Sequence, residues 1–275
     1  FRNVTGTWNL TGAYSDAAPG EVDQVQVQFQ RVADAYYYNM ASTLWGSAAV
    51  DNPAALAGTW SLAFPTTALE NGKAYTVFAR ARDKALNTQP FVQSEFTYDL
   101  LQPTATIVAP GNGEIRSTLV FISGTAADAP AAGRLDRVDV QLRRHSDNQY
   151  WTGGGTWIFP STWVATTFVG DSSGTWSVIT PALAHNTTYV IASRALDKAG
   201  NFQNTPYGVP LSSRTFRWDA LAPVTAVTNP PAPGPVIRNS QTVIDGSASD
   251  DPAVTGTVDV AVRYEVAGTT RYWNA

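Results

Sequence analysis

The stretch Leu69–Asn87 reads LENGKAYTVFARARDKALN, and it recurs later in the chain as Leu183–Asn201, LAHNTTYVIASRALDKAGN. Both copies contain a leucine, a tyrosine six residues further on, and the closing pattern Arg-x-x-Asp-Lys-Ala-x-Asn. Other markers keep the same order around each copy. GTWS lies upstream at 58–61 and 174–177, and Phe-x-aromatic-Asp lies downstream at 96–99 and 216–219. The chain is therefore built from a repeated unit.

A third marker occurs three times, as TGAYSD at 11–16, SGTAAD at 123–128 and DGSASD at 245–250. Hydrophobic residues follow each copy at every second position, as in Val138, Val140 and Leu142. We therefore predict three units, 1–102, 103–222 and 223–275, joined by short proline-containing linkers at Leu100–Pro103 and Ala220–Pro223. We expect unit 1 to lack its first strand, unit 2 to be complete and unit 3 to be partial.

Period-two alternation bounded by Gly, Pro and Asp is typical of half-buried strands, and short strands separated by turns favour an antiparallel sandwich. The tyrosines Tyr75 and Tyr189 have the spacing of a tyrosine corner, in which the phenol bonds to an upstream backbone group. Two short stretches, Val32–Tyr36 and Asp51–Ala57, are the helical candidates. The strands expected in unit 2 are Thr104–Ala109, Leu119–Thr125, Arg137–Arg143, Tyr150–Phe159, Trp163–Val169, Thr175–Ile179, Thr188–Ala195 and Ser213–Trp218.

The SGTAAD turn, the Val-x-Val-x-Leu strand, GTWS and the Asp-Lys-Ala-Gly-Asn segment together resemble tandem bacterial immunoglobulin-like (Big-type) domains. Such domains occur in large secreted or surface adhesin and filament proteins. The resemblance covers nearly the whole chain, and it implies an all-β fold of tandem immunoglobulin-like antiparallel β-sandwiches in a linear array. The long aromatic insertions at Tyr36–Trp45 and Tyr150–Trp163 depart from the simplest pattern of the family.

Composition and motifs argue against several classes of function. A net charge of −4 lacks the basic footprint of a nucleic-acid binder, and no apolar run is long enough to span a membrane. Cysteine is absent and the two histidines, His145 and His185, have no zinc-binding spacing. Gly170–Gly174 matches G-x-S-x-G but leads into a strand, whereas a nucleophile elbow leads into a helix. We expect an ordinary hairpin turn there, surface histidines, and no enzyme.

Aspartates occupy the loops that a sandwich of this topology brings to one end. For unit 2 they are Asp99 in the entering linker, Asp128 after the turn marker and Asp197 in the last hairpin. Three converging carboxylates would suit Ca²⁺, which takes six to eight oxygen ligands, and a bound ion would stiffen the joint between units. The alternative is that each Asp caps its own turn. The pattern recurs in part in unit 1 and unit 3, at Asp16, Asp83, Asp219 and Asp250, with Asp251 beside the last.

Aromatic residues gather in the corresponding insertion of each unit, and three interpretations stay open for them. Buried, they would complete the core or cover a sheet edge. Exposed, they would form a protein contact or a platform on which sugars stack. The residues are Tyr36, Tyr37, Tyr38 and Trp45 in unit 1, Tyr150, Trp151, Trp157 and Trp163 in unit 2, and Tyr272 and Trp273 in unit 3.

The sequence thus predicts a structural segment of an extracellular, cell-surface fibre, filament or adhesin stalk. Its partners would be copies of itself or further repeats of the same protein, because the Val258, Val260, Val262, Tyr264 stripe of unit 3 has no second sheet to cover it. Apart from Ca²⁺ we expect no cofactor. The alternative function is a carbohydrate-binding module that uses the aromatic insertions to recognise surface glycans.

Overall fold

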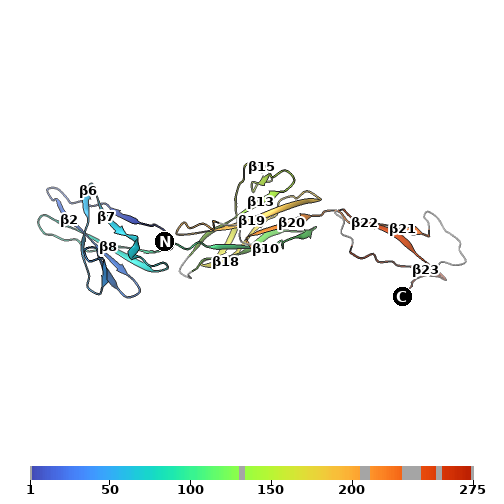
Figure 1. Cartoon of the computed structure of the whole chain (residues 1–275), viewed down its shortest axis with the longest axis horizontal. Helices are drawn as coiled ribbons and strands as arrows, with labels where there is room; N and C mark the ends of the chain where they lie inside the picture. The colour runs from blue at the N-terminus through green and yellow to red at the C-terminus, as the bar shows by residue number, and fades with distance from the viewer. Residues whose placement is uncertain (1, 130–133, 205–210, 231–242, 252–255, 274–275) are drawn as a thin grey trace.

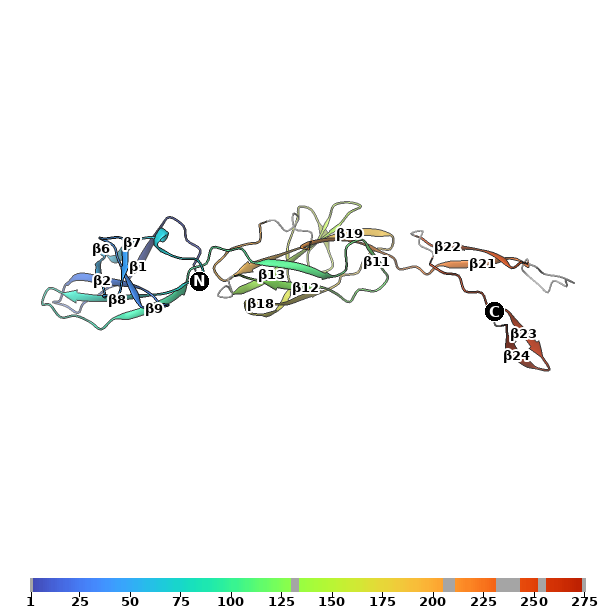
Figure 2. The same cartoon turned by 60° about the horizontal axis from the view of Figure 1, so that its bottom comes forward.

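A computed structural model describes residues 2–129, 134–204, 211–230, 243–251 and 256–273. In these ranges the chain is built from β-strands, and the one helical element is the 3₁₀ turn η1, Thr66–Ala68. No helix formed by these residues has the length and apolarity to cross a membrane. The strands form three groups, one after another along the long axis of the molecule (Figures 1 and 2). The all-β prediction is therefore confirmed.

The first group consists of two antiparallel sheets. The smaller sheet has the order β1-β7-β6, and the larger has the order β4-β3-β2-β8-β9 with β5 paired to β2. The strands are β1 Thr7–Gly12, β2 Val22–Arg31, β3 Tyr36–Asn39, β4 Leu44–Gly46, β5 Asn52–Pro53, β6 Ala55–Ala57, β7 Thr59–Pro65, β8 Ala74–Asp83 and β9 Val92–Thr97.

The second group also consists of two sheets, antiparallel except for the parallel pair β11–β20. The smaller sheet has the order β10-β12-β18-β17, and the larger has the order β11-β20-β19-β13-β14-β15 with β16 paired to β13. The strands are β10 Thr104–Ala109, β11 Glu114–Arg116, β12 Phe121–Ala127, β13 Leu135–Arg144, β14 Tyr150–Trp151, β15 Trp157–Ile158, β16 Val164–Ala165, β17 Thr167–Gly170, β18 Ser173–Ile179, β19 Thr187–Asp197 and β20 Ser213–Trp218.

The alternation read from the sequence forms the two cores. Along β2 the side chains of Val25, Val27 and Phe29 are buried, and the glutamines between them are half-buried. Because side chains alternate across a strand, one face of each sheet packs against its partner sheet. The core of the second group contains Val138, Val140 and the other inward-facing residues of β13. Each core is separate, so the two sandwiches pack their hydrophobic residues independently.

Both tyrosine corners are present. The hydroxyl of Tyr75 accepts a hydrogen bond from the Glu70 backbone N–H at 2.8 Å, and the hydroxyl of Tyr189 accepts one from the Ala184 N–H at 2.8 Å. Both tyrosine side chains are fully buried. The recurring leucine-to-tyrosine spacing therefore has a physical cause, because it places the phenol under the turn that enters the strand.

Both helical predictions are wrong. Asp51–Ala57 contains the short strands β5 and β6. The first pairs with β2, where the buried Asn52 side chain also donates to the Val27 carbonyl at 3.2 Å, and the second pairs with β7. Residues 32–35 form the turn between β2 and β3, in which Ala35 takes a positive φ of 58°, and Tyr36 begins β3. Pairing with a neighbouring strand outweighs weak local helix propensity in both places.

The third group is less extensive than the pattern predicts. It contains the pairs β21 Val224–Asn229 with β22 Asp245–Ser249, and β23 Arg263–Val266 with β24 Thr269–Tyr272. The alternating stretch at 258–262 is not a strand, because no neighbouring strand among the described residues pairs with it. Pairing, and not alternation alone, makes a strand. The boundaries of the three units stay a prediction.

Candidate metal centre

The predicted cluster of three aspartates lies at the joint between the first and second strand groups. Asp99 follows β9 in the linker, Asp128 follows β12 directly, and Asp197 is the last residue of β19. The N-terminal segment lies beside this joint (Figure 1). There the Asp99 N–H donates to the Arg2 carbonyl at 2.9 Å. The sandwich topology therefore brings together three carboxylates that are far apart in the sequence.

The three carboxylates are close enough to share one ion. One ligand oxygen from each lies within 4.8 Å of the others, and among the described residues this is the one such group of three or more acidic, histidine or cysteine residues. Oxygens bound to one Ca²⁺ at about 2.4 Å can be no further apart than about 4.8 Å. Because every ligand atom is a carboxylate oxygen, the group favours a hard cation over zinc or copper.

Burial leaves part of this oxygen set without partners. The exposed fraction is 1% for Asp99, 6% for Asp128 and 2% for Asp197. Oδ2 of Asp99 and both carboxylate oxygens of Asp128 have no hydrogen-bond partner among the described residues. None of the three aspartates takes part in an ion pair with another described residue. Among the described residues, therefore, no cationic side chain pairs with the cluster to balance its charge.

Burial and mutual repulsion raise the pKa of two carboxylates in the cluster. Two unit charges 5 Å apart repel by about 3 kcal/mol at an effective dielectric constant near 20. Burial, followed by the charges of Asp99 and Asp197, raises the pKa of Asp128 to about 7. Burial, with the charge of Asp197, also raises the pKa of Asp99. Keeping all three carboxylates ionised in this buried cluster therefore costs electrostatic free energy.

Asn201 holds the Asp197 carboxylate and the Asp99 backbone, a role that the sequence analysis did not assign to it. Its backbone N–H and side-chain amide donate to the two carboxylate oxygens of Asp197 at 2.8 and 2.7 Å. The same amide donates to the Asp99 carbonyl at 3.1 Å, and its oxygen accepts from the Asn3 amide at 3.3 Å. The repeated Asp-x-x-x-Asn spacing is the signal that could have found it, since Asn87 binds Asp83 in the same way.

The other predicted ligands form no second group of three within the part of the chain that the structure describes. Asp16 is exposed, and Asp83 is bound by Asn87. Asp219 repeats the setting of Asp99, because its N–H donates to the Arg116 carbonyl at 2.9 Å and its Oδ1 accepts from the Leu221 N–H at 3.1 Å. Asp250 instead accepts from the N–H of the next residue, Asp251, at 3.0 Å. The turn-capping alternative describes Asp83 and Asp250 well.

The aromatic insertions pack mainly inward. Tyr38 and Trp151 are buried in the two cores, and Trp45 and Trp157 pack against them. Trp45 lies under the Arg31 guanidinium, 5.0 Å from it, and Trp157 lies under Arg144 at 4.9 Å, so the two insertions repeat one contact. The partly buried members are Tyr37, Tyr150 and Trp163, and the exposed ones are Tyr36, Tyr272 and Trp273. Because Trp151 is 4% exposed, it offers no face on which a sugar could stack.

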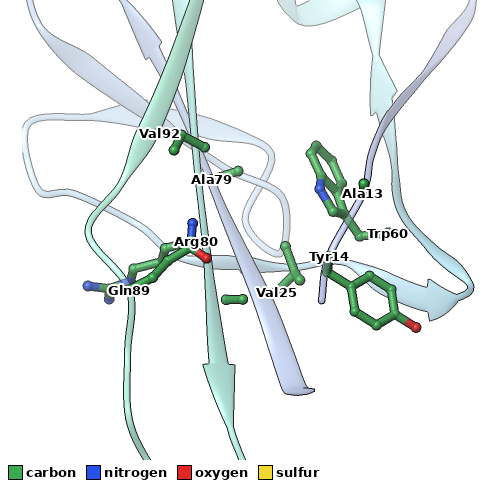
Figure 3. Close-up of a pocket in the computed structure, with 9 residues that line it drawn as sticks. Ala13, Tyr14, Val25, Trp60, Ala79, Arg80, Gln89 and Val92 are labelled. Atoms are coloured by element: carbon green, nitrogen blue, oxygen red, sulfur yellow. The ribbon is translucent and has the colours of Figure 1, made fainter. Parts of the chain in front are cut away.

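No constellation typical of catalysis is found among the described residues. Gly170–Gly174 is the turn of the β17–β18 hairpin, as predicted. His145 is exposed, and His185 accepts a hydrogen bond at Nδ1 from the Ala220 N–H at 3.0 Å. A pocket of about 40 Å³ lies between Trp60, Tyr14 and Arg80 in the first sandwich (Figure 3). Binding pockets for small molecules usually measure about 300–1,000 Å³, so this one is too small for a substrate.

Comparisons with known proteins leave the family open. No protein-family model and no curated protein matches the chain. Among solved structures, the chain is similar to fibronectin(III)-like modules of Clostridium thermocellum CbhA, with 15% identity, a TM-score of 0.38, and coverage of 79% of this chain and 88% of that one.

A second similar structure is the tetra-tandem repeat in the extending region of a large adhesion protein, with 18% identity and a TM-score of 0.32 over 80% of this chain. The chain spans 47% of that structure. The chicken CNTN1 FN1–FN3 domains show 11% identity and a TM-score of 0.27, over 82% of this chain and 67% of theirs. Likenesses this weak assign neither family nor function, and the immunoglobulin-like sandwich stands on the strand arrangement of the chain itself.

Proposed function

We propose that the chain is a structural segment of an extracellular surface fibre, filament or adhesin stalk built of immunoglobulin-like repeats. The observation that supports this most is the way the joint is held from both sides. The Asp99 N–H donates to Arg2 in the first sandwich, and the Asp99 carbonyl accepts from Asn201 in the second. A linker bound at both ends transmits force and direction between units, which is what a spacer requires.

The third strand group supports self-association as part of this function. Val258, Val260 and Trp273 are each more than half exposed. A groove of about 480 Å³ runs between Val227, Ile244 and Val258. Exposed apolar side chains beside unpaired strand edges favour the addition of strands from another chain. We propose that a neighbouring copy, or further repeats of the same protein, covers this surface.

Negative-stain electron microscopy and light scattering after size exclusion test both parts. The expected particles are thin rods that lengthen or bundle as the protein concentration rises. Val258→Asp with Val260→Asp should leave single rods, because charge opposes burial of this surface. Thr59→Asp with Thr175→Asp, on exposed positions of the first two sandwiches, is the matched control and should associate like the parent chain.

Two results would count against this function. Compact particles at all concentrations would exclude a spacer, and rods that stay single up to millimolar concentration would exclude self-association. The surface location has its own test, because an antibody against the chain should label intact source cells as strongly as permeabilised ones. Labelling of permeabilised cells alone would contradict an extracellular role.

A further inference from the structure

The joint between the first two sandwiches contains three buried carboxylates with no positive partner among the described residues. Asp99, Asp128 and Asp197 offer oxygens within 4.8 Å of one another, and all three side chains are more than nine-tenths buried. Three of their six oxygens have neither solvent contact nor a hydrogen-bond partner among the described residues. Buried polar atoms are almost always satisfied in native proteins, so unpartnered carboxylate oxygens in a cluster this close indicate a missing positive charge.

The other three carboxylate oxygens accept hydrogen bonds, which fix their positions. Asn201 holds both oxygens of Asp197, and the Leu101 N–H holds Oδ1 of Asp99 at 3.0 Å. These bonds orient the carboxylates without neutralising them. A carboxylate oxygen that accepts one hydrogen bond keeps a further lone pair for a metal ion. The arrangement is that of a prepared ligand set, in which neutral amides position the negative groups.

We infer that Asp99, Asp128 and Asp197 bind one Ca²⁺ and that this ion locks the first sandwich to the second. Calcium fits better than magnesium, because it accepts irregular oxygen geometry and replaces its water readily, whereas Mg²⁺ demands a near-ideal octahedron. One ligand comes from the linker and two come from the second sandwich, so the ion bridges parts that could otherwise move apart. The stiffening role rests on the proposed stalk function, but the binding of the ion does not.

The equivalent positions in the first sandwich provide matched controls. Asp16 corresponds to Asp128 and Asp83 corresponds to Asp197 by the repeated motifs, yet neither belongs to a group of three among the described residues. Asp16→Asn and Asp83→Asn therefore remove the same charge from the same type of loop without touching the proposed site.

The first test is calorimetric titration of the full chain with Ca²⁺ after treatment with a chelator. We expect one ion per chain, a rise in Tm of roughly 5–10 °C at saturating Ca²⁺, and much weaker binding of Mg²⁺. Asp128→Asn should abolish the rise in Tm, whereas Asp16→Asn and Asp83→Asn should keep it. Without Ca²⁺, Asp128→Asn should melt at or above the Tm of the parent chain, because it removes a repelling buried charge. This last result separates loss of the site from loss of the fold.

The second test measures the joint itself. Because the chain contains no cysteine, Thr59→Cys with Thr175→Cys places spin labels only at these exposed positions, one in each sandwich. The distribution of distances between the labels should narrow when Ca²⁺ is added, and should not change in the Asp128→Asn background.

Absence of binding heat and of any Tm shift would overturn the inference and leave a cluster that holds protons. Equal affinity for Mg²⁺ would overturn the assignment to calcium. If bound Ca²⁺ left the distribution of label distances unchanged, the claim that the ion fixes the first sandwich relative to the second would be wrong. None of these results depends on whether the chain forms rods or associates, so failure of this site and failure of the proposed function are distinguishable.

Discussion

Gly124 shows why single residues recur from unit to unit. The Trp176 indole of the GTWS motif lies across this position, and its Nε1 donates to the carbonyls of Thr106 and Thr125 at 3.1 and 3.2 Å. A Cβ on Gly124 would lie 2.6 Å from the indole and 1.8 Å from the Thr106 carbonyl oxygen. At Gly12 a Cβ would lie 2.5 Å from Trp60. The glycine of the turn marker and the tryptophan of GTWS therefore recur together because one packs on the other.

We expect Gly124→Ala to destabilise the second sandwich by about 1–3 kcal/mol, because the added methyl group overpacks the core against backbone and indole. Urea denaturation followed by tryptophan fluorescence measures the change. Gly154→Ala is the control, since nothing lies within 4 Å of the added Cβ. Equal stability of the two variants would show that the indole can move aside.

The tyrosine corner permits a second test at this scale. Tyr189→Phe keeps the buried ring but leaves the Ala184 N–H without its acceptor. The expected loss is about 1 kcal/mol, the net contribution of one hydrogen bond of this kind. Tyr75→Phe should lose a similar amount in the first sandwich, because the bond there has the same length. A loss in one variant only, measured by the same denaturation, would contradict the equivalence of the two corners.

At the scale of the strands, β13 and β19 carry a buried charge network that β2 and β8 carry in weaker form. Asp139 accepts from Arg194 at 3.1 Å and from Arg137 at 3.1 Å, with its side chain 7% exposed. Arg194 also stacks on Trp163, 4.3 Å from the ring centre. In the first sandwich the equivalent Arg80 donates instead to Gln26 and to Asp51, whose side chain is 29% exposed.

This difference in burial predicts different costs for the same substitution in the two repeats. Arg194→Ala should cost about 2–3 kcal/mol, because it leaves a buried carboxylate with a single remaining partner. Arg80→Ala should cost about 1 kcal/mol or less, because Asp51 stays partly in water. Hydrogen exchange assigns each unfolding transition to its strands, and denaturation gives the two free energies. A larger loss for Arg80→Ala would contradict the account.

At the scale of the whole molecule, the free energy of unfolding depends on the protonation of the three carboxylates that separate segments bring together at the joint. The pKa of Asp128, raised to about 7 by burial and by Asp99 and Asp197, lies far above the usual 3.8 of an aspartate. Below about pH 4 both the folded and the unfolded chain keep this proton. Between about pH 4 and 7 the unfolded chain loses it first, so folding becomes less favourable as the pH rises.

With a chelator present, the parent chain should therefore lose stability relative to Asp128→Asn as the pH rises from about 4 to 7, by on the order of 4 kcal/mol. The comparison with the variant cancels the other carboxylates, and denaturation at a series of pH values provides it. A constant difference between the two proteins across this range would show that the carboxylate of Asp128 is already neutralised by another group.

Local pattern determined much of this protein. The repeat, the alternation in β2 and β13, the tyrosine corners and the hairpin at Gly170–Gly174 follow from residues close together in the sequence. Strand alternation and turn chemistry act over a few residues, so these features can be predicted from the sequence without the tertiary structure. The convergence of Asp99, Asp128 and Asp197 was also predicted, because the topology of a sandwich sets which loops share an end.

Contacts between distant segments decided the rest. Asn52 made a strand of a stretch with helical pattern by bonding to Val27, and the packing of Trp151 settled which of three interpretations holds for that residue. Asp16 and Asp83 join no group of three among the described residues, and the part played by Asn201 depends on the Asp99 carbonyl across the joint. Burial and desolvation are properties of the assembled sandwich, so Asp83 and Asp197 cap the same turn but only Asp197 also belongs to a buried charge cluster among the described residues.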